Sequence, residues 1–264
     1  DHTKDKLIYQ EDDEAFYCGV FKTKSKKYIM IVSGSTVSTE YRYINAEQPG
    51  DKFKIIQARE RDLEYSIDHF GEKFYIVTNL KAKNFRLMAT DVSNPRKENW
   101  QEIIPHRTDV FLDCIDIFKD YLVVSERKNG LMNLRIIRWD NEYEYNIDFG
   151  EEAYLAYTST NRDFNTEILR FGYTSLTTPN SIYDFNMKSR EKVLLKQEEV
   201  LGGFDPTLYE TKRLYATAAD GAKIPVSIVY KKGIKKNRKN PLLLYGYGSY
   251  GITIDPSFSS VRLS

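Results

Sequence analysis

Apolar and polar positions alternate along the first three quarters of the chain in a plan that repeats. Each copy has a β-rich run, a polar turn and a second β-rich run, as in "KFYIVTNLKAKNFRLMATD" (73–91) and "DYLVVSERKNGLMNLRIIRWD" (120–140). Further copies lie at 27–45 and, more weakly, at 170–187, so the copies start 46 to 50 residues apart. Because the runs are rich in Val, Ile, Thr and Tyr and lack helical periodicity, they favour strands over a helical solenoid.

A period of this length filled with strands is typical of β-propeller blades, each of which is an antiparallel sheet of about four strands. We therefore expect a mostly β fold in which residues 1–203 form a partial β-propeller of about four blades. Four blades are too few to close a ring comfortably, so we expect the later part of a larger propeller. A β-sandwich with similar strand spacing is the alternative.

The character of the chain changes near "VLGGFDPTLYET" (200–211), where two glycines and a proline interrupt the strand pattern as at a domain junction. Residues 204–264 are therefore expected to begin a second domain. Within it, Asp220-Gly221 separates two strand-like runs and predicts a β-hairpin. The continuous apolar run "LLLY" (242–245) predicts a strand buried on both faces.

The next turn has the spacing Gly246-x-Gly248-x-x-Gly251, which is also that of a dinucleotide-binding turn. A Rossmann site needs a helix after the third glycine, whereas "ITIDPSFSSVRLS" has no helical periodicity. We therefore predict no cofactor. Glycines can instead let a chain turn sharply beside a ligand, and a tyrosine held there can donate to a carbonyl oxygen that gains negative charge in acyl transfer. The alternative is that the tyrosines only pack the turn.

Charge and composition restrict the class of partner. The net charge is +1, from 39 basic and 38 acidic residues, which argues against a dedicated nucleic-acid binder. The basic run at 231–240 is interpreted as a solvated loop between two strands, and "EDDE" at 11–14 as an exposed turn. No apolar run approaches the ~18 residues of a membrane span, and no signal segment opens the chain. We expect no membrane partner and a cytoplasmic location.

Cysteines and histidines are too few for a metal centre. Cys18 and Cys114 predict two half-buried thiols in a reducing compartment, although a disulfide between them is possible. The histidines are scattered, and no metal is predicted. Since His69 and His106 lie in blade segments, we interpret them as surface or packing residues rather than as catalytic bases.

A family resemblance sharpens the interpretation of the tyrosine turn. "KRLYATAADGAKIPVSIVYKKG" (212–233) and "NPLLLYGYGSYGITIDPSFSSVRLS" (240–264) resemble the opening of the catalytic domain in the prolyl oligopeptidase family of serine peptidases. Gly248-Ser249-Tyr250-Gly251 resembles the oligopeptidase B branch, whereas the proline-specific branch usually has Gly-Phe at 249–250. Segments 5–31 and 64–87 are also similar to oligopeptidase B blades, so the resemblance spans nearly the whole chain.

The resemblance implies a seven-bladed propeller that caps an α/β-hydrolase domain, of which 204–264 would be the first strands. It implies hydrolysis of short peptides after Lys or Arg by a Ser, His and Asp triad, with the propeller as an access filter. By the resemblance, Tyr247 helps to stabilise the oxyanion, and Tyr250 lines the pocket for the side chain before the scissile bond. No other catalytic or substrate-binding residue is assigned.

The resemblance also implies an incomplete chain. No G-x-S-x-G nucleophile motif occurs, and the triad and the specificity acids are expected downstream of the last residue. We therefore expect the 264-residue chain to be inactive by itself. An unclosed propeller would leave strand edges unpaired, which predicts self-association. The alternatives are a propeller binding module without catalysis and a proline-specific oligopeptidase.

Overall fold

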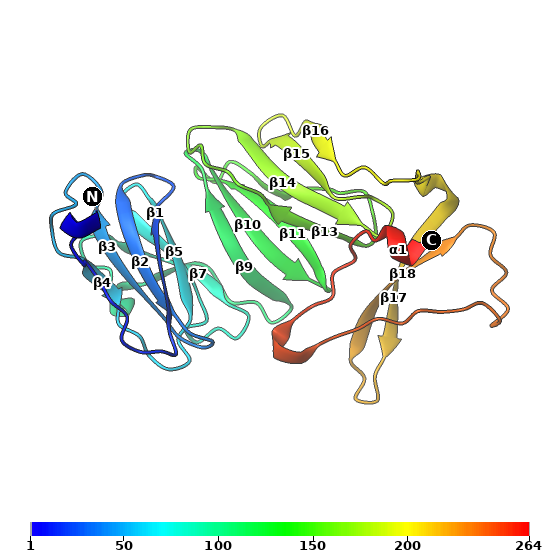
Figure 1. Cartoon of the computed structure of the whole chain (residues 1–264), viewed down its shortest axis with the longest axis horizontal. Helices are drawn as coiled ribbons and strands as arrows, with labels where there is room; N and C mark the ends of the chain where they lie inside the picture. The colour runs from blue at the N-terminus through cyan, green and yellow to red at the C-terminus, as the bar shows by residue number, and fades with distance from the viewer. Residues whose placement is uncertain (1, 264) are drawn as a thin grey trace. The chain divides into compact units, whose positions relative to one another are not determined.

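The computed structural model describes residues 2–263, and nearly all of its regular structure is strand (Figure 1). The chain divides into two compact units, Asp1–Lys119 and Asp120–Ser264. This division falls between repeats rather than near residue 203, so the predicted domain boundary stays a prediction. Each unit is described separately below.

The first unit contains two four-stranded antiparallel sheets, each built from strands in sequence order, followed by a ninth strand. The strands of the first sheet are β1 (Tyr17–Lys22), β2 (Tyr28–Gly34), β3 (Thr39–Asn45) and β4 (Lys54–Gln57). The second sheet has β5 (Tyr65–Phe70), β6 (Lys73–Thr78), β7 (Arg86–Asp91) and β8 (Gln101–Ile104), and β9 spans Val110–Ile117. Short 3₁₀ turns are η1 (His2–Lys4) and η2 (Lys97–Asn99).

The second unit continues the same plan and then departs from it. Its first strands are β10 (Tyr121–Lys128), β11 (Leu131–Arg138) and β12 (Glu144–Asn146). A four-stranded antiparallel sheet follows, with β13 (Tyr154–Thr158), β14 (Ile168–Ser175), β15 (Ser181–Asn186) and β16 (Lys192–Gln197) in order. The remainder holds η3 (Pro206–Leu208), the hairpin β17 (Tyr209–Thr217) and β18 (Lys223–Lys231), η4 (Ser249–Gly251) and helix α1 (Ser260–Leu263).

The repeats predicted from the sequence coincide with the central strand pairs of these sheets. Segment 73–91 is the antiparallel pair β6–β7, and 120–140 contains the pair β10–β11. Segments 27–45 and 170–187 correspond to β2–β3 and β14–β15. The prediction of a mostly β fold with several four-stranded antiparallel sheets is therefore confirmed.

The core of the first unit is strongly aromatic and lies between its two sheets. Phe74 is fully buried, and its ring meets those of Tyr28 and Tyr43 edge to face at centroid distances of 5.4 and 5.1 Å. Tyr65 also belongs to this core and is only 2% exposed. Its hydroxyl donates to the Gln57 carbonyl at 2.7 Å and accepts from the Tyr41 amide at 3.0 Å. Backbone groups thus replace water as partners, which lets a phenol be buried at little cost.

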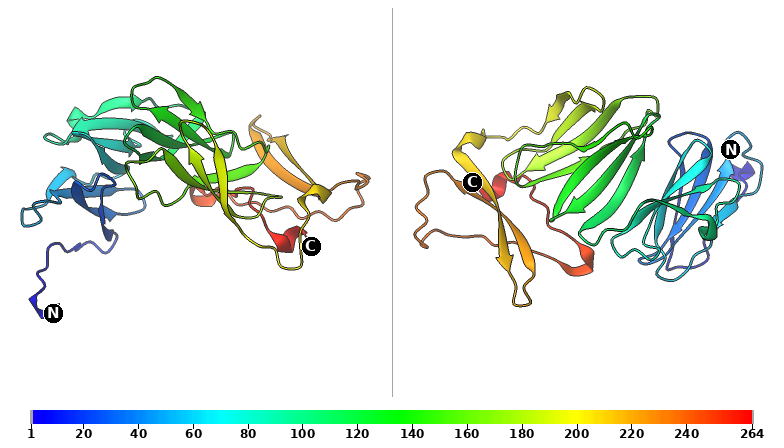
Figure 2. Two further views of the ribbon diagram at one scale, coloured as in Figure 1. Left: turned by 90° about the horizontal axis from the view of Figure 1, so that it is seen from above. Right: turned by 180° about the vertical axis from the view of Figure 1, so that it is seen from behind.

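In the second unit the Asp220-Gly221 hairpin is confirmed, because β17 and β18 pair in antiparallel register from Tyr209–Lys231 to Thr217–Lys223. The chain then runs through an exposed loop and returns past the β10–β11 end of the same unit (Figure 2). The basic run 231–240 is exposed as predicted, but no second strand follows it in the described chain.

The predicted strand at 242–245 is wrong. Leu242, Leu243 and Leu244 are 77%, 70% and 81% exposed, and the segment has no strand assignment. A strand buried on both faces needs hydrogen-bonded neighbours and covering layers, and none of the described residues supply them. An apolar run by itself therefore did not suffice to specify a buried strand here.

Two smaller predictions also need correction. Residues 12–14 of the acidic run are exposed, but the Glu11 carboxylate is covered and accepts from both Nη atoms of Arg59, at 2.6 and 3.2 Å. These hydrogen bonds lower the pKa of Glu11 well below its usual range. Neither cysteine forms a disulfide within the described residues; Cys114 is half-buried as expected, and Cys18 is exposed rather than half-buried. Between residues 2 and 263, no helix is long and apolar enough to cross a membrane.

Candidate active-site segment

The tyrosine turn lies in the exposed loop that follows β18. Gly248 precedes the short 3₁₀ turn η4, and Tyr250 inside that turn has a left-handed backbone, with φ 59° and ψ 28°. Gly251 continues in the left-handed region, with φ 69°. A non-glycine residue in this conformation carries local strain of roughly 1–2 kcal/mol, and such residues concentrate at functional sites. The chain after Gly251 is extended, and only the four-residue α1 follows, so the helix that a Rossmann site requires is absent from the described chain.

Both predicted site residues present their side chains to solvent. Tyr247 is 50% exposed and Tyr250 is 92% exposed. Within residues 2–263, no hydrogen bond engages either hydroxyl, so both donors remain available. The three glycines of the turn have open space where a Cβ would stand. The structure therefore brings the two tyrosines into one short, solvent-exposed turn.

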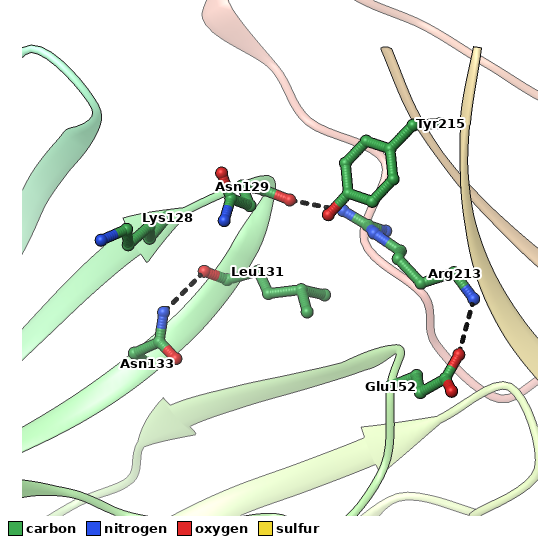
Figure 3. Close-up of a pocket in the computed structure, with 7 residues that line it drawn as sticks. All are labelled: Lys128, Asn129, Leu131, Asn133, Glu152, Arg213 and Tyr215. Carbon is green, nitrogen blue, oxygen red and sulfur yellow. Dashed lines mark hydrogen bonds between the residues drawn. The ribbon is translucent and has the colours of Figure 1, made fainter. Parts of the chain in front are cut away.

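Contacts within the second unit hold the segments on both sides of this turn. The Arg213 amide on β17 donates to Glu152 Oε2 at 3.1 Å, and its guanidinium donates to the Asn129 carbonyl at 2.8 Å. These groups border an open pocket of about 510 Å³, which Figure 3 shows with Tyr215 beside Arg213. On the far side of the turn, Asp255 forms an ion pair with Arg127.

Sequence reasoning missed this group of residues. Arg127 and Asp255 are 128 positions apart, so only the tertiary structure pairs them. One local signal was present, because Asn129-Gly130 between two strand-like runs is a strong hairpin signal in its own right. It would have located the turn, though not the residues that it contacts.

The two blade histidines lie in different surroundings within the first unit. His69 is buried, and its Nδ1 lies 2.8 Å from Ser25 Oγ. A serine–histidine base needs a carboxylate on its other ring nitrogen, but the His69 Nε2 is buried without a partner among the described residues. Burial also lowers the pKa of His69 to about 4. The pair is therefore a hydrogen bond inside the blade, and the predicted packing of His69 agrees with its burial. His106 is half-buried in the loop after β8.

The described His, Cys, Asp and Glu side chains do not form a group that would support metal binding. In the part of the chain that the structure describes, no group of three His, Cys, Asp or Glu side chains could hold a metal ion. The candidate segment offers hydroxyl donors on a strained, glycine-rich turn.

Comparison with known proteins places this geometry in context. Among curated proteins, dipeptidyl aminopeptidase BI of Pseudoxanthomonas mexicana is 40% identical over 264 residues, which cover 99% of this chain and 36% of that protein. Protease 2 of Moraxella lacunata is 29% identical over 100% of this chain and 38% of its own length. This chain thus spans little more than a third of these relatives.

A solved structure shows the same fold. Oligopeptidase B from Trypanosoma brucei, in its closed form with covalently bound antipain, matches with a TM-score of 0.89 and 32% sequence identity. The match covers 100% of this chain and 39% of that one. It supports the partial propeller over the β-sandwich alternative.

The family model described as prolyl oligopeptidase, N-terminal beta-propeller domain, matches residues 1–198, which is most of the chain. That match agrees with the four-stranded antiparallel sheets seen in the same residues. The chain therefore belongs to the prolyl oligopeptidase family.

Proposed function

We propose that this chain is the propeller part and the start of the hydrolase domain of an oligopeptidase B-like serine peptidase, which hydrolyses short peptides after Lys or Arg. The observation that carries the proposal is the tyrosine turn, in which the solvent-exposed Tyr247 lies three positions before Tyr250, whose own backbone is strained. The likeness to an oligopeptidase B over the whole chain supports it.

In this proposal Tyr247 donates its hydroxyl to the oxyanion of the tetrahedral intermediate. A preorganised donor of this kind lowers the barrier by a few kcal/mol, or about 10²–10³ in rate. Tyr250 lines the pocket for the side chain that precedes the scissile bond. The nucleophile, base and orienting acid are supplied by residues outside this chain, which has no G-x-S-x-G motif.

The experiment uses the complete protein that contains this chain. Blocked peptides that differ only at one central residue (Arg, Lys, Pro or Leu) are incubated with the enzyme, and mass spectrometry locates the cleaved bond. We expect cleavage after Arg and Lys. Cleavage only after Pro would identify a proline-specific oligopeptidase, and no cleavage of any peptide, with or without the blocking group, would favour the binding module.

A second candidate function is supported by the relative named dipeptidyl aminopeptidase, which is 40% identical to this chain. Such an enzyme would release dipeptides from a free amino terminus. The same peptides without the blocking group separate the two functions, because only an aminopeptidase needs the free amine. Release of dipeptides from free peptides, with blocked peptides left intact, would favour this second function.

The access-filter role is tested with substrate size. One Arg-containing sequence is presented as a short peptide and as an exposed loop of a folded protein. A propeller that restricts entry predicts cleavage of the peptide alone, and equal cleavage rates would contradict it. The 264-residue chain without the rest of the protein serves as the control and is expected to cleave neither.

A further inference from the structure

One hairpin turn in the second unit contacts both segments that flank the tyrosine turn. This turn is Asn129-Gly130, between β10 and β11, where Lys128 pairs directly with Leu131. Asn129 and Gly130 both have left-handed backbones, with φ of 51° and 75°. That combination defines a type I′ turn, whose twist matches that of the flanking strands. The turn is therefore a well-defined support at the end of a paired β-ribbon.

The upstream attachment is made by β17. Arg213 Nη2 donates to the Asn129 carbonyl at 2.8 Å (Figure 3). Arg213 Nη1 donates to Ser227 Oγ on β18 at 2.5 Å. A Cβ on Gly130 would lie 2.6 Å from Arg213 Nη2 and 3.1 Å from Pro225 Cγ. Glycine at position 130 thus permits both the turn and the close approach of the hairpin β17–β18.

The downstream attachment is an ion pair. Arg127 Nη1 donates to Asp255 Oδ1 at 2.5 Å, and Arg127 Nη2 donates to Oδ2 at 3.1 Å. Arg127 Nη1 also lies 3.3 Å from the Gly130 carbonyl, so this arginine links the turn itself to Asp255. The two side chains are only 23% and 19% exposed. A bidentate, partly buried pair of this kind fixes orientation as well as distance.

The surroundings of Asp255 extend this attachment. Pro256 is buried, and the Phe258 amide donates to Thr174 Oγ1 on β14 at 3.1 Å. The Phe258 ring packs edge to face on Phe204 at 4.9 Å. By contrast, the residues from 235 to 251 are exposed and belong to no strand. The tyrosine turn is therefore the distal part of a loop whose two ends are fixed on the same blade segment.

We propose that Arg127 and Asp255 are positioning residues that fix Tyr247 and Tyr250 for the reaction. The inference rests on the proposed function, because it assigns these residues to the same site. Asp255 lies only five positions after Tyr250, so a change in its attachment is transmitted through a short stretch of chain. A displacement of a catalytic group by about 1 Å can lower the rate roughly 10²-fold. The Arg127–Asp255 pair can therefore affect the rate through the position of the tyrosines, without contacting substrate.

The first test measures attachment in the 264-residue chain by hydrogen–deuterium exchange. Asp255→Asn is expected to raise amide exchange in peptides covering 252–258 by about tenfold, with β10 and β11 still protected. Asp184→Asn is the matched control, because Asp184 also pairs with an arginine, Arg170, through two hydrogen bonds, of 2.8 and 2.9 Å, in the same unit. Unchanged exchange at 252–258 in Asp255→Asn, or an equal rise there in Asp184→Asn, overturns the inference.

The second test measures turnover in the complete protein. Asp255→Asn is expected to lower kcat by about tenfold or more with little change in KM, and Asp255→Glu, which keeps the charge, to recover most of the loss. An unchanged kcat, or a loss that appears only in KM, overturns the positioning role. If the unsubstituted protein has no peptidase activity, the proposed function fails, and the positioning role of Arg127 and Asp255 in catalysis fails with it. The exchange experiment then still decides whether the pair holds the segment.

Discussion

Two adjacent titratable groups in the first unit, the half-buried Asp68 and the buried His69, predict an unusual pH dependence of stability. Burial raises the pKa of Asp68 from 3.8 to about 6 and lowers the pKa of His69 from 6.5 to about 4. Both lie on β5, and the Asp68 carboxylate accepts from the His69 amide at 2.8 Å and from the Lys24 amide at 3.4 Å. The perturbations are Asp68→Asn and His69→Asn, each of which removes one titration.

The two titrations oppose each other. Asp68 binds its proton more tightly in the folded state, so its stabilising contribution is full below pH 3.8 and is lost as the pH rises through 6. His69 binds its proton less tightly in the folded state, so its contribution is present above pH 6.5 and is lost as the pH falls toward 4. Each changes the free energy of unfolding by about 1.4 kcal/mol per pH unit, or about 3 kcal/mol over its window.

The unsubstituted chain should therefore show almost no slope from these two groups between about pH 4 and 6, since the folded and unfolded states each bind one of the two protons. In Asp68→Asn the free energy of unfolding should rise with pH across this window. In His69→Asn it should fall with pH. A substitution can also change the free energy of unfolding by an amount that is the same at every pH. That amount does not alter the slope of the free energy of unfolding against pH, so the slopes of the variants can be compared directly.

Urea unfolding at several pH values provides the assay. Trp100 is buried in the first unit and Trp139 lies in the second, so Trp139→Phe leaves one fluorescent reporter beside the tested groups. All variants are made in that background. Glu11 and other carboxylates titrate in every variant and cancel in the difference between slopes. Equal slopes in the parent and in both variants would refute the reasoning.

Three further predictions follow from packing, backbone geometry and sheet edges. Phe74→Ala removes a fully buried ring and should lower the free energy of unfolding of the first unit by about 3–5 kcal/mol, as measured with the same Trp100 reporter. Gly130→Ala places a Cβ at φ 75° and against Arg213, and should lower the melting temperature, whereas Gly71→Ala, also left-handed but with open space, should lower it less. The edge strand β16 exposes Val193 and Leu195, so the chain should associate at high concentration, as measured by light scattering. The double variant Val193→Lys with Leu195→Lys should associate less. An unsubstituted chain that stays monomeric would contradict the self-association prediction.

Much of the fold was predictable because strands leave a period in the sequence. The segments at 73–91 and 120–140 are rich in apolar and β-branched residues because much of their length is buried, and they proved to be β6–β7 and the region of β10–β11. The outer strand β16 is exposed throughout and β1 is exposed at all but one position, so both leave a weaker pattern. The hairpin at Asp220-Gly221 was predictable from local turn chemistry.

The failures share a physical cause, which is that tertiary neighbours decide the outcome. The apolar run at 242–245 satisfies the local requirements of a strand, but the described chain offers it no neighbouring strand. Glu11 belongs to an acidic run that reads as solvated, yet Arg59 covers it from 48 positions away. The pair Arg127 and Asp255 has no signature in the sequence for the same reason.

For the candidate site, the sequence located the turn and the family but not the attachments. Tyr247 and Tyr250 do lie together on a strained, exposed turn, and their catalytic roles stay predictions. The strain at Tyr250 was not predicted, because a left-handed backbone at a tyrosine is disfavoured locally and has to be imposed by the surrounding chain.

The proposed function depends most on the Tyr247 hydroxyl, which is proposed to stabilise an oxyanion during peptide hydrolysis. Its most direct test is the turnover number of the complete protein and of its Tyr247→Phe variant on one Arg-containing peptide amide, with Tyr245→Phe as a neighbouring control. We expect Tyr247→Phe to lower kcat by about 10²–10³ with KM nearly unchanged, and the control variant to retain its activity. A Tyr247→Phe enzyme with the kcat of the unsubstituted protein would contradict this expectation.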